Sequence, residues 1–327
     1  MPKVIPLGQR PGIYLTADGW TNLFAAMRQS PRGQPVLEGI IAAADESLGQ
    51  AVILPDPKTP AQVGSRGDAP AKAHDGLAMQ AGRCAYAYRI TGHPKYAQRV
   101  REILVGYARL YPNDYQEHKG VNGSDTSKVM AQRLSEAMWL IPLIQAYDLT
   151  ADNSLFSGQD RALIENDLIR CALTFINRKT SAAETVAGKT AKNPRWRTDP
   201  APRSASAGAL GNWTAFYNLA YVQGGSVLGD QDWIDLGADG LKYMIENGIG
   251  EDGMWGEGAI GYQQFARHAM VGGLEALACK GIDLWRYKTN AFKNLFDSEF
   301  AYAYPDGTSP GINDSSRAPV GSGWTAM

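Results

Sequence analysis

Residues 211–229 read GNWTAFYNLAYVQGGSVLG, and this stretch decides the fold. Its large apolar residues recur at helical spacing over a wide face, which predicts a buried helix. These residues are Trp213, Phe216, Tyr217, Ala220 and Tyr221. The segment from residue 230 starts with an Asp-rich cap and ends at Gly248, so it predicts a second helix. The Gly-rich turn EDGMWGEGAIGY, residues 251–262, then leads into a third helix that runs to about residue 280.

Helical signals continue outward from this stretch, with almost no alternating strand pattern. Predominantly apolar helices, each beside a more amphipathic neighbour, are expected at residues 74–91, 127–149, 207–225 and 257–279. We predict an all-α fold in which these are the inner helices of an incomplete (α/α)-toroid, with about five helical hairpins around a central cleft. An α-solenoid fits the same pattern, but the lack of a fixed repeat period counts against it.

The chain is expected to divide near residue 300. Residues 1–300 carry the helical pattern and form the predicted toroid domain, whereas residues 301–327 form a turn-rich tail without a core-forming period. The 327 residues, of which 44% are hydrophobic, are enough for a sizeable core.

Composition and charge narrow the classes of partner and cofactor. A formal net charge of -1 provides no basic field, so we expect neither nucleic acid nor a membrane surface as a partner. No run approaches the ~18 apolar residues of a membrane span. The cysteines at 84, 171 and 279 are far apart, so they support neither a disulfide framework nor a CxxC metal site. We expect no metal and no cofactor. The sequence does not specify an oligomeric state.

Polar residues beside glycines mark a candidate site. Asn212 opens one buried helix, Tyr262 opens another, and Asp252, Trp255 and Glu257 lie in the Gly-rich turn. Small residues let a ligand approach the backbone, and helix N-termini attract anions, so this pattern fits a cleft wall. In the structural alternative, Asn212 caps its helix and Tyr262 packs in the core.

A basic loop precedes Asn212. Its charged and aromatic residues are Lys189, Lys192, Arg195, Trp196, Arg197 and Arg203. Guanidinium groups beside a Trp that can stack on a sugar favour binding of an anionic carbohydrate, with Arg195, Trp196 and Arg197 as contacts. The alternative is a solvated linker.

Four motifs, in order along the chain, resemble a known family. They are TGHPKYAQRVREIL at 91–104, RLSEAMWLIPLIQAYDL at 133–149, GNWTAFYNLAY at 211–221 and DGMWGEGAIGYQQFARHAM at 252–270. Together they resemble the (α/α)-toroid domain of alginate lyases and heparinase II/III-like polysaccharide lyases. The tail YPDGTSPGINDS, 304–315, resembles the segment after that toroid. On this resemblance, the tail begins a linker to a β-sheet domain that the chain lacks.

The resemblance implies β-elimination at a uronic acid, without a cofactor. The C5 proton becomes acidic only when the neighbouring carboxylate is neutralised by hydrogen-bond donors. Asn212 matches the family's neutralising Asn, and Gln132 lies where a Gln commonly faces the same site. Tyr262 matches the catalytic Tyr, which gives a proton to the leaving O4 and, if ionised, acts as base.

The sequence departs from the family where some relatives have His after the Asn, since this chain has Trp213. His268 is the candidate catalytic substitute, although it lies some 120° around the helix from Tyr262. We expect Trp213, Trp255, Glu257 and Arg267 to contribute to substrate binding. For Arg267, a salt bridge with Glu257 is the structural alternative.

The expected partner is an anionic polysaccharide, and the expected location is periplasmic or secreted, with a signal peptide missing from the given sequence. A cytoplasmic location is the alternative. Two other functions remain open. Asp252 and Glu257 fit a glycoside hydrolase, because paired carboxylates hydrolyse glycosides and hydrolases also use (α/α) barrels. A non-catalytic toroid that binds uronate polymers is the third possibility. Absorbance from an unsaturated product distinguishes the lyase from both.

Overall fold

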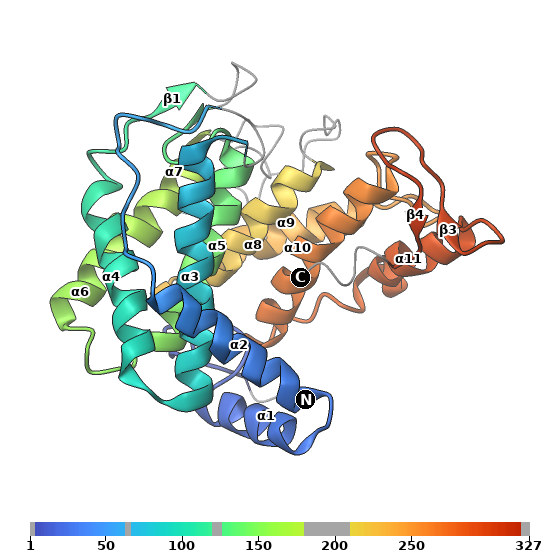
Figure 1. The fold of residues 1–327 in the computed structure, drawn as a ribbon. Helices are drawn as coiled ribbons and strands as arrows, with labels where there is room; N and C mark the ends of the chain where they lie inside the picture. The colour runs from blue at the N-terminus through green and yellow to red at the C-terminus, as the bar shows by residue number, and fades with distance from the viewer. Residues whose placement is uncertain (1–3, 63–66, 120–125, 180–209, 322–327) are drawn as a thin grey trace. The chain divides into compact units, whose positions relative to one another are not determined.

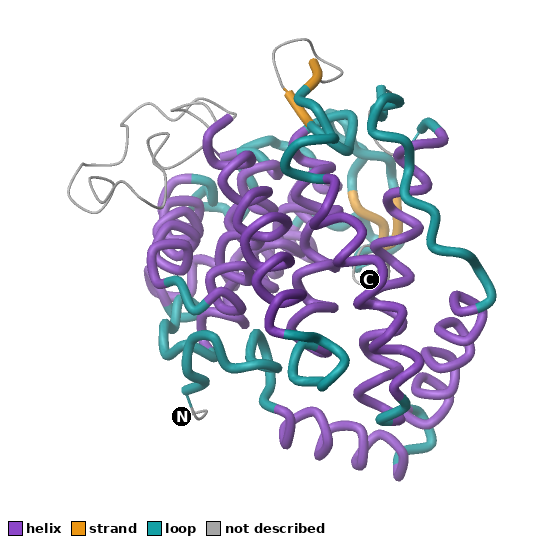
Figure 2. Tube along the Cα trace, turned by 90° about the vertical axis from the view of Figure 1, so that its left-hand side faces the viewer, coloured by secondary structure: helices purple, strands orange, loops and turns teal. Residues whose placement is uncertain are grey.

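The computed structural model describes residues 4–62, 67–119, 126–179 and 210–321 (Figure 1). The described residues are mostly helical, with two short antiparallel hairpins, β1–β2 and β3–β4 (Figure 2). The helices are α1 (Ala17–Gln29), α2 (Gly33–Leu48), α3 (Ala69–Thr91), α4 (Pro94–Leu110), α5 (Arg133–Thr150), α6 (Gly158–Leu163), the π-helical η1 (Ile164–Arg170), α7 (Cys171–Lys179), α8 (Asn212–Leu228), α9 (Gln231–Asn247), α10 (Ile260–Ala278) and α11 (Tyr287–Ala301). The strands are β1 (His118–Lys119), β2 (Thr126–Ser127), β3 (Thr308–Ser309) and β4 (Ala318–Pro319). The prediction of an all-α chain is confirmed.

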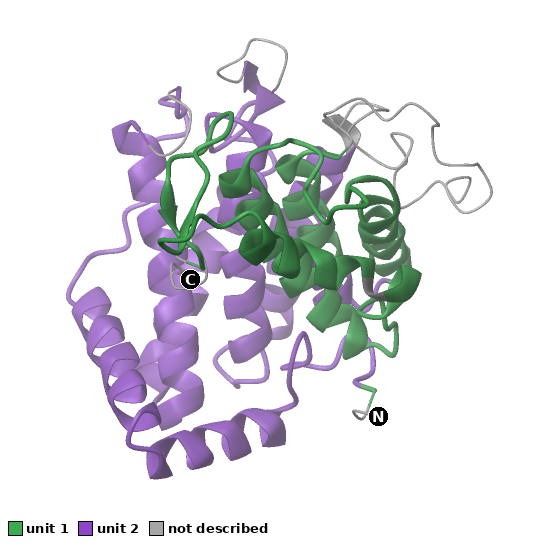
Figure 3. Cartoon of the chain, turned by 90° about the vertical axis from the view of Figure 1, so that its right-hand side faces the viewer, with its two compact units in different colours: residues 1–4, 180–222, 231–327 green, residues 5–179, 223–230 purple. Residues whose placement is uncertain are grey.

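The chain forms two compact units (Figure 3). Unit 2 consists of residues 5–179 and 223–230, and unit 1 contains the described parts of the remaining chain. Helix α8 contributes to both, because its residues up to Val222 belong to unit 1 and those from Gln223 belong to unit 2. The candidate site on α8 and α10 therefore lies in unit 1.

In unit 2, the core is built on α3 and α5. Helix α3 packs against α2, α4 and α5, and almost every residue of α5 is buried. Both helices were predicted as apolar inner helices, and the burial of α5 agrees with its apolar sequence. None of the described helices of either unit is long and apolar enough to cross a membrane.

Helix α5 starts later than predicted, at Arg133 instead of residue 127. The cause is Glu136, whose carboxylate is fully buried and accepts hydrogen bonds from the backbone N–H groups of Lys128 (3.3 Å), Val129 (3.1 Å) and Met130 (3.0 Å). Because the carboxylate satisfies these donors, the preceding segment forms a turn around Glu136 and needs no helical carbonyl partners.

In unit 1, α9 packs against α10 and α11, and it approaches α8 closely at two glycines. A Cβ on Gly240 would lie 2.2 Å from Asn218 Oδ1, and one on Gly237 would lie 2.8 Å from the Asn218 carbonyl oxygen. Side chains at these two positions would push the helices apart. This close packing positions the start of α8, which carries Asn212.

Candidate active site

Asn212 is the first residue of α8, and it is bound to Glu257 in the turn before α10. Its backbone N–H donates to Glu257 Oε2 at 2.8 Å, and its side-chain Nδ2 lies 3.1 Å from Oε1 and 3.3 Å from Oε2. The Asn212 side chain is buried, and Glu257 is half-buried. The first backbone N–H of α8 has no acceptor within the helix, and the Glu257 carboxylate accepts its hydrogen bond. The negative charge of this carboxylate also interacts favourably with the positive end of the helix dipole.

Trp255 completes the binding of the Glu257 carboxylate. Its indole Nε1 donates to Glu257 Oε2 at 2.7 Å, and its backbone N–H donates to Gln263 Oε1 at 2.9 Å. Gln263 in turn donates to the Leu295 carbonyl oxygen of α11 at 2.8 Å. The Trp255 ring is only 1% exposed, so it is a core residue and offers no face for a sugar. Substrate binding by Trp255 stays a prediction, and its role in this structure is to hold Glu257.

Tyr262 lies in the first turn of α10, with 36% of its surface exposed. Its hydroxyl donates a hydrogen bond to Asp314 Oδ2 at 3.1 Å. This bond is the main reason that the pKa of Tyr262 lies above its ordinary value, followed by partial desolvation and the charges of Asp314 and Glu257. Tyr262 is therefore protonated at neutral pH.

Asp314 was not nominated from the sequence, although it lies within the tail motif at residues 304–315. Its neighbours dock the same turn onto the start of α10. Asn313 Nδ2 donates to the Gly258 carbonyl oxygen at 2.9 Å, and the Gly261 N–H donates to Ser315 Oγ at 2.7 Å. The consecutive side chains of Asn313, Asp314 and Ser315 thus bind the start of α10: Asn313 binds the turn just before the helix, and the other two bind its first turn. The only sequence signal was the turn-forming Asn-Asp-Ser run, which indicates a turn but gives no partner.

Glu257 links the two central candidates. It binds Asn212 directly, and its charge contributes to the raised pKa of Tyr262. The structure therefore joins Asn212 at the start of α8 to Glu257 in the turn before α10, and it places Tyr262 in the first turn of α10, within the same unit.

His268 lies further along α10, and its half-buried ring is 6.1 Å from the ring of Phe216. Burial lowers the pKa of His268, so the imidazole is neutral near pH 7. Six positions separate it from Tyr262, and helix geometry places the two side chains about 120° apart. The described ring contact of His268 is thus with the apolar ring of Phe216.

Arg267 belongs to the core of unit 1. It is 4% exposed and forms an ion pair with Glu299, which is fully buried, and its guanidinium lies 4.5 Å from the centre of the Phe296 ring. The predicted structural partner, Glu257, is wrong, because Glu257 binds Asn212 and Trp255 while Glu299 of α11 faces Arg267. In this structure Arg267 thus forms a buried, structural ion pair, and its binding to substrate stays a prediction.

Asp252 and Glu257 are held by separate donors. Asp252 is exposed and accepts from the Tyr302 hydroxyl at 2.7 Å and the Met254 N–H at 3.0 Å. The hydrogen bond from Tyr302, followed by that from Met254, lowers the pKa of Asp252. A lowered pKa is the opposite of what a glycosidase acid needs.

The remaining nominated residues are placed differently. Trp213 is the second residue of α8 and is half-buried. Gln132 is the N-cap of α5, in unit 2, where its side chain makes no capping hydrogen bond. Arg195, Trp196 and Arg197 lie outside the described residues.

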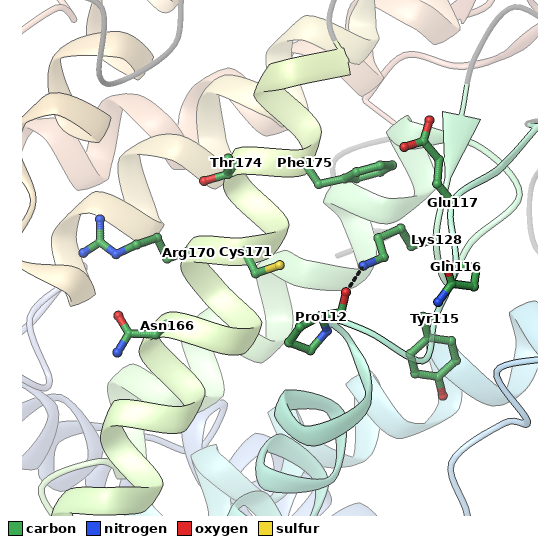
Figure 4. A pocket seen from close by; sticks show the side chains of 10 residues that line it. All are labelled: Pro112, Tyr115, Gln116, Glu117, Lys128, Asn166, Arg170, Cys171, Thr174 and Phe175. Carbon is green, nitrogen blue, oxygen red and sulfur yellow. Dashed lines mark hydrogen bonds between the residues drawn. The ribbon is translucent and has the colours of Figure 1, made fainter.

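A separate pocket of about 380 Å³ lies in unit 2 (Figure 4). Its lining residues are Pro112, Tyr115, Gln116, Glu117, Lys128, Asn166, Arg170, Cys171, Thr174 and Phe175, none of which was nominated from the sequence. Its cations have protein partners: Lys128 Nζ donates to the Pro112 carbonyl oxygen at 3.1 Å, and Arg170 forms an ion pair with Asp230. The pocket therefore gives no clear site for an anionic sugar.

Comparison with known proteins gives one consistent result. The sequence model of the alginate lyase family matches residues 49–308. An alginate lyase of Stenotrophomonas maltophilia is 35% identical over 89 residues, which are 27% of this chain and 12% of that protein. An exo-oligoalginate lyase of Saccharophagus degradans is 23% identical over 167 residues, which are 51% of this chain and 22% of that protein. The matched stretches are thus less than a quarter of either relative.

A solved structure agrees with these sequence matches. The alginate lyase from Bacteroides ovatus superposes with a TM-score of 0.59 and 14% identity, over 91% of this chain and 84% of that one. The likeness shows a shared helical fold, and it confirms the predicted fold class of the (α/α)-toroid lyases.

Proposed function

Because the chain belongs to the alginate lyase family, we propose that it cleaves a uronate-containing polysaccharide by β-elimination. The names of its relatives, an alginate lyase and an exo-oligoalginate lyase, support alginate as the first substrate to test. Since an intact polymer is met outside the cytoplasmic membrane, we place the activity in the periplasm or outside the cell.

The observation that carries this proposal is the match of the alginate lyase model to residues 49–308, which include Asn212 and Tyr262, together with the hydrogen bonds between Asn212 and Glu257. The carboxylate orients the Asn212 amide through its hydrogen bonds and acts electrostatically on Tyr262. An Asn amide has two N–H donors, and in this scheme we assign one to Glu257 and the other to the carboxylate of a bound uronate. In the proposed site, that donor stabilises the enolate that forms after the C5 proton is removed.

Tyr262 supplies the proton for the leaving oxygen in this scheme. Its raised pKa keeps the hydroxyl protonated at neutral pH, and its partial exposure makes the oxygen accessible to a sugar. A positioned hydroxyl can therefore protonate O4 as the C4–O4 bond breaks. The loop at residues 189–203 adds positive charge to the chain just before Asn212, and we propose that Arg195, Trp196 and Arg197 bind the polymer.

A glycoside hydrolase is the weaker candidate. Hydrolysis needs a carboxylic acid with a raised pKa, whereas Tyr302 and Met254 lower the pKa of Asp252. Glu257 is the other carboxylate of that pair, and three N–H groups from Asn212 and Trp255 already hold it.

The test is to incubate the purified chain with alginate, and in parallel with heparan-type and hyaluronan polymers. A lyase produces a C4=C5 double bond conjugated with the carboxylate, which absorbs in the ultraviolet. New reducing ends without this absorbance would indicate hydrolysis. Binding in the absence of either product would leave a non-catalytic uronate-binding protein.

A further inference from the structure

The proposed elimination needs a base for the C5 proton, and we propose that Tyr262 and Asp314 supply it together as a proton relay. In this relay the Tyr262 oxygen takes the C5 proton while its own proton passes to Asp314. Asp314 is then the positioning residue and proton acceptor of Tyr262. This inference rests on the proposed lyase function.

The direction of the Tyr262–Asp314 hydrogen bond favours a relay. The hydroxyl donates to Asp314 Oδ2 at 3.1 Å, so its lone pairs point elsewhere. The oxygen can therefore accept a proton from a substrate as its own proton passes to Asp314. Both side chains are accessible, because Tyr262 is 36% exposed and Asp314 is exposed.

A tyrosinate base is disfavoured at this position. The charged groups that act on Tyr262 are Asp314 from the tail and Glu257 from the turn before α10, and both raise its pKa. An ordinary tyrosine with a pKa of about 10 is already protonated near neutrality, and these charges make ionisation harder. A relay does not require Tyr262 to ionise, because its hydroxyl proton moves to Asp314 while the C5 proton arrives.

Among the described residues, few other groups near Tyr262 can act as a base. Trp213 follows Asn212, and the His268 ring contacts Phe216. Glu257 is occupied by Asn212 and Trp255. Asp314 is the carboxylate in direct contact with the Tyr262 hydroxyl.

The position of Asp314 is fixed by its neighbours. Asn313 binds the Gly258 carbonyl oxygen at 2.9 Å, and Ser315 accepts from the Gly261 N–H at 2.7 Å. These contacts on both sides hold the carboxylate over the first turn of α10, as a relay partner requires.

The steps balance without a cofactor. The C5–H bond breaks, its electron pair is delocalised into the uronate carboxylate, the C5 proton bonds to the Tyr262 oxygen, and the original hydroxyl proton moves to Asp314. The C4–O4 bond then breaks as the C4=C5 double bond forms. O4 receives a proton from Tyr262, which regains one from Asp314, so both residues return to their starting states.

The test compares Asp314→Asn with the wild type by measuring kcat, KM and their pH dependence. We expect kcat to fall by about 10²-fold or more at neutral pH with little change in KM, as for a lost general base. Residual activity in Asp314→Asn should rise with pH, because removal of the Asp314 charge lets Tyr262 ionise more easily. Asp314→Glu should restore part of kcat, since it keeps the carboxylate.

Two controls separate the relay from tail docking. Asp306→Asn removes a carboxylate from the same tail, where Asp306 binds Thr308 and Arg317, and it should leave kcat near the wild-type value. Ser315→Ala weakens docking but keeps Asp314, so it should cost less than Asp314→Asn and leave the shape of the pH profile unchanged. If Ser315→Ala and Asp314→Asn lose kcat equally, and neither changes the shape of the pH profile, the relay is overturned. Asp314 would then only help to dock the tail turn.

An activity-independent measurement completes the test. The ultraviolet titration difference between wild type and Tyr262→Phe gives the pKa of Tyr262, and the same difference in an Asp314→Asn background should give a lower value. An unchanged value would overturn the coupling. If the wild type forms no unsaturated product from any uronate polymer, the proposed function fails and the relay fails with it. Product from the wild type together with full activity of Asp314→Asn would overturn the relay alone.

Discussion

The side-chain amide of Asn212 donates to the Glu257 carboxylate, with Nδ2 3.1 Å from one oxygen and 3.3 Å from the other. The backbone N–H of Asn212 donates to the same group at 2.8 Å, so the carboxylate fixes both the start of α8 and the orientation of the amide. A pre-oriented donor pays little reorganisation cost when charge develops on a substrate.

Asn212→Ala should therefore lower turnover by about 10²-fold or more, as the loss of one transition-state donor usually does. The measurement is the initial rate of ultraviolet absorbance increase on a uronate polymer. Asn247→Ala, an exposed Asn at the end of α9 in the same unit, is the control and should stay near the wild-type rate. Full activity of Asn212→Ala would remove this residue from the proposed site.

Tyr262→Phe should lower kcat by about 10²–10⁴-fold, because it deletes the proton-carrying oxygen and leaves the ring. The far-ultraviolet circular dichroism spectrum should stay helical. Tyr302→Phe is the matched control, since Tyr302 is also an exposed tyrosine bound to an aspartate, Asp252. If Tyr262→Phe keeps most of its activity, the proton must come from another group.

Glu257→Ala should destabilise the fold by about 1–3 kcal/mol, because the buried Asn212 amide and Trp255 indole lose their acceptor. Urea denaturation followed by tryptophan fluorescence measures this change. Glu251→Ala removes an exposed carboxylate from the same turn and should change stability by no more than about 0.5 kcal/mol. Equal stability of the two variants would show that the Glu257 hydrogen bonds contribute nothing net.

Substituting both Arg195 and Arg197 with Gln should weaken the binding of anionic oligosaccharides and reduce its salt dependence, because two cations are lost. Titration calorimetry at two salt concentrations measures both effects. A control that removes the exposed cations Arg32 and Lys58 should have a smaller effect. Unchanged affinity in the Arg195 and Arg197 variant would leave residues 189–203 as a linker.

His74 predicts a loss of stability in acid. It is 1% exposed on α3, with Nδ1 2.8 Å from the Tyr107 hydroxyl, and burial lowers its pKa to about 4. Below the ordinary pKa of about 6.5, His74 binds a proton in the unfolded chain, whereas the buried imidazole of the folded chain stays neutral until the pH falls to about 4. The free energy of unfolding should therefore fall by about 3 kcal/mol from this group as pH drops from about 6.5 to about 4.

His74→Asn should reduce that pH dependence, whereas His93→Asn should not, because His93 is an exposed N-cap residue of α4. The measurement is urea denaturation at several pH values. An identical slope in the wild type and His74→Asn would contradict the burial argument.

The helices could be predicted because each depends on local apolar periodicity and on the residues that start and end it. The Asp-rich start and the terminal glycine lie at the two ends of the segment that became α9, and the apolar face of α8 is a pattern within that helix. The start of α5 was missed because it depends on Glu136, whose role appears only when a carboxylate and several backbone donors meet in three dimensions.

The site was harder to predict, because its bonds join distant residues. Glu257 is 45 positions from Asn212, and Asp314 is 52 positions from Tyr262. Spacing also cannot distinguish a tryptophan that stacks on a sugar from one that is buried, as Trp255 is in this structure. Arg267 was given the wrong partner for the same reason, since Glu299 is 32 positions away on α11.

The contact between Gly261 and Ser315 also provides a reporter that needs no substrate. The first amides of a helix have no partner within the helix, and that of Gly261 is satisfied by Ser315 Oγ at 2.7 Å. Its hydrogen exchange therefore requires the tail turn to detach, and the exchange rate gives the free energy of that opening. A single backbone amide can thus show how much of the time Asp314 is held beside Tyr262.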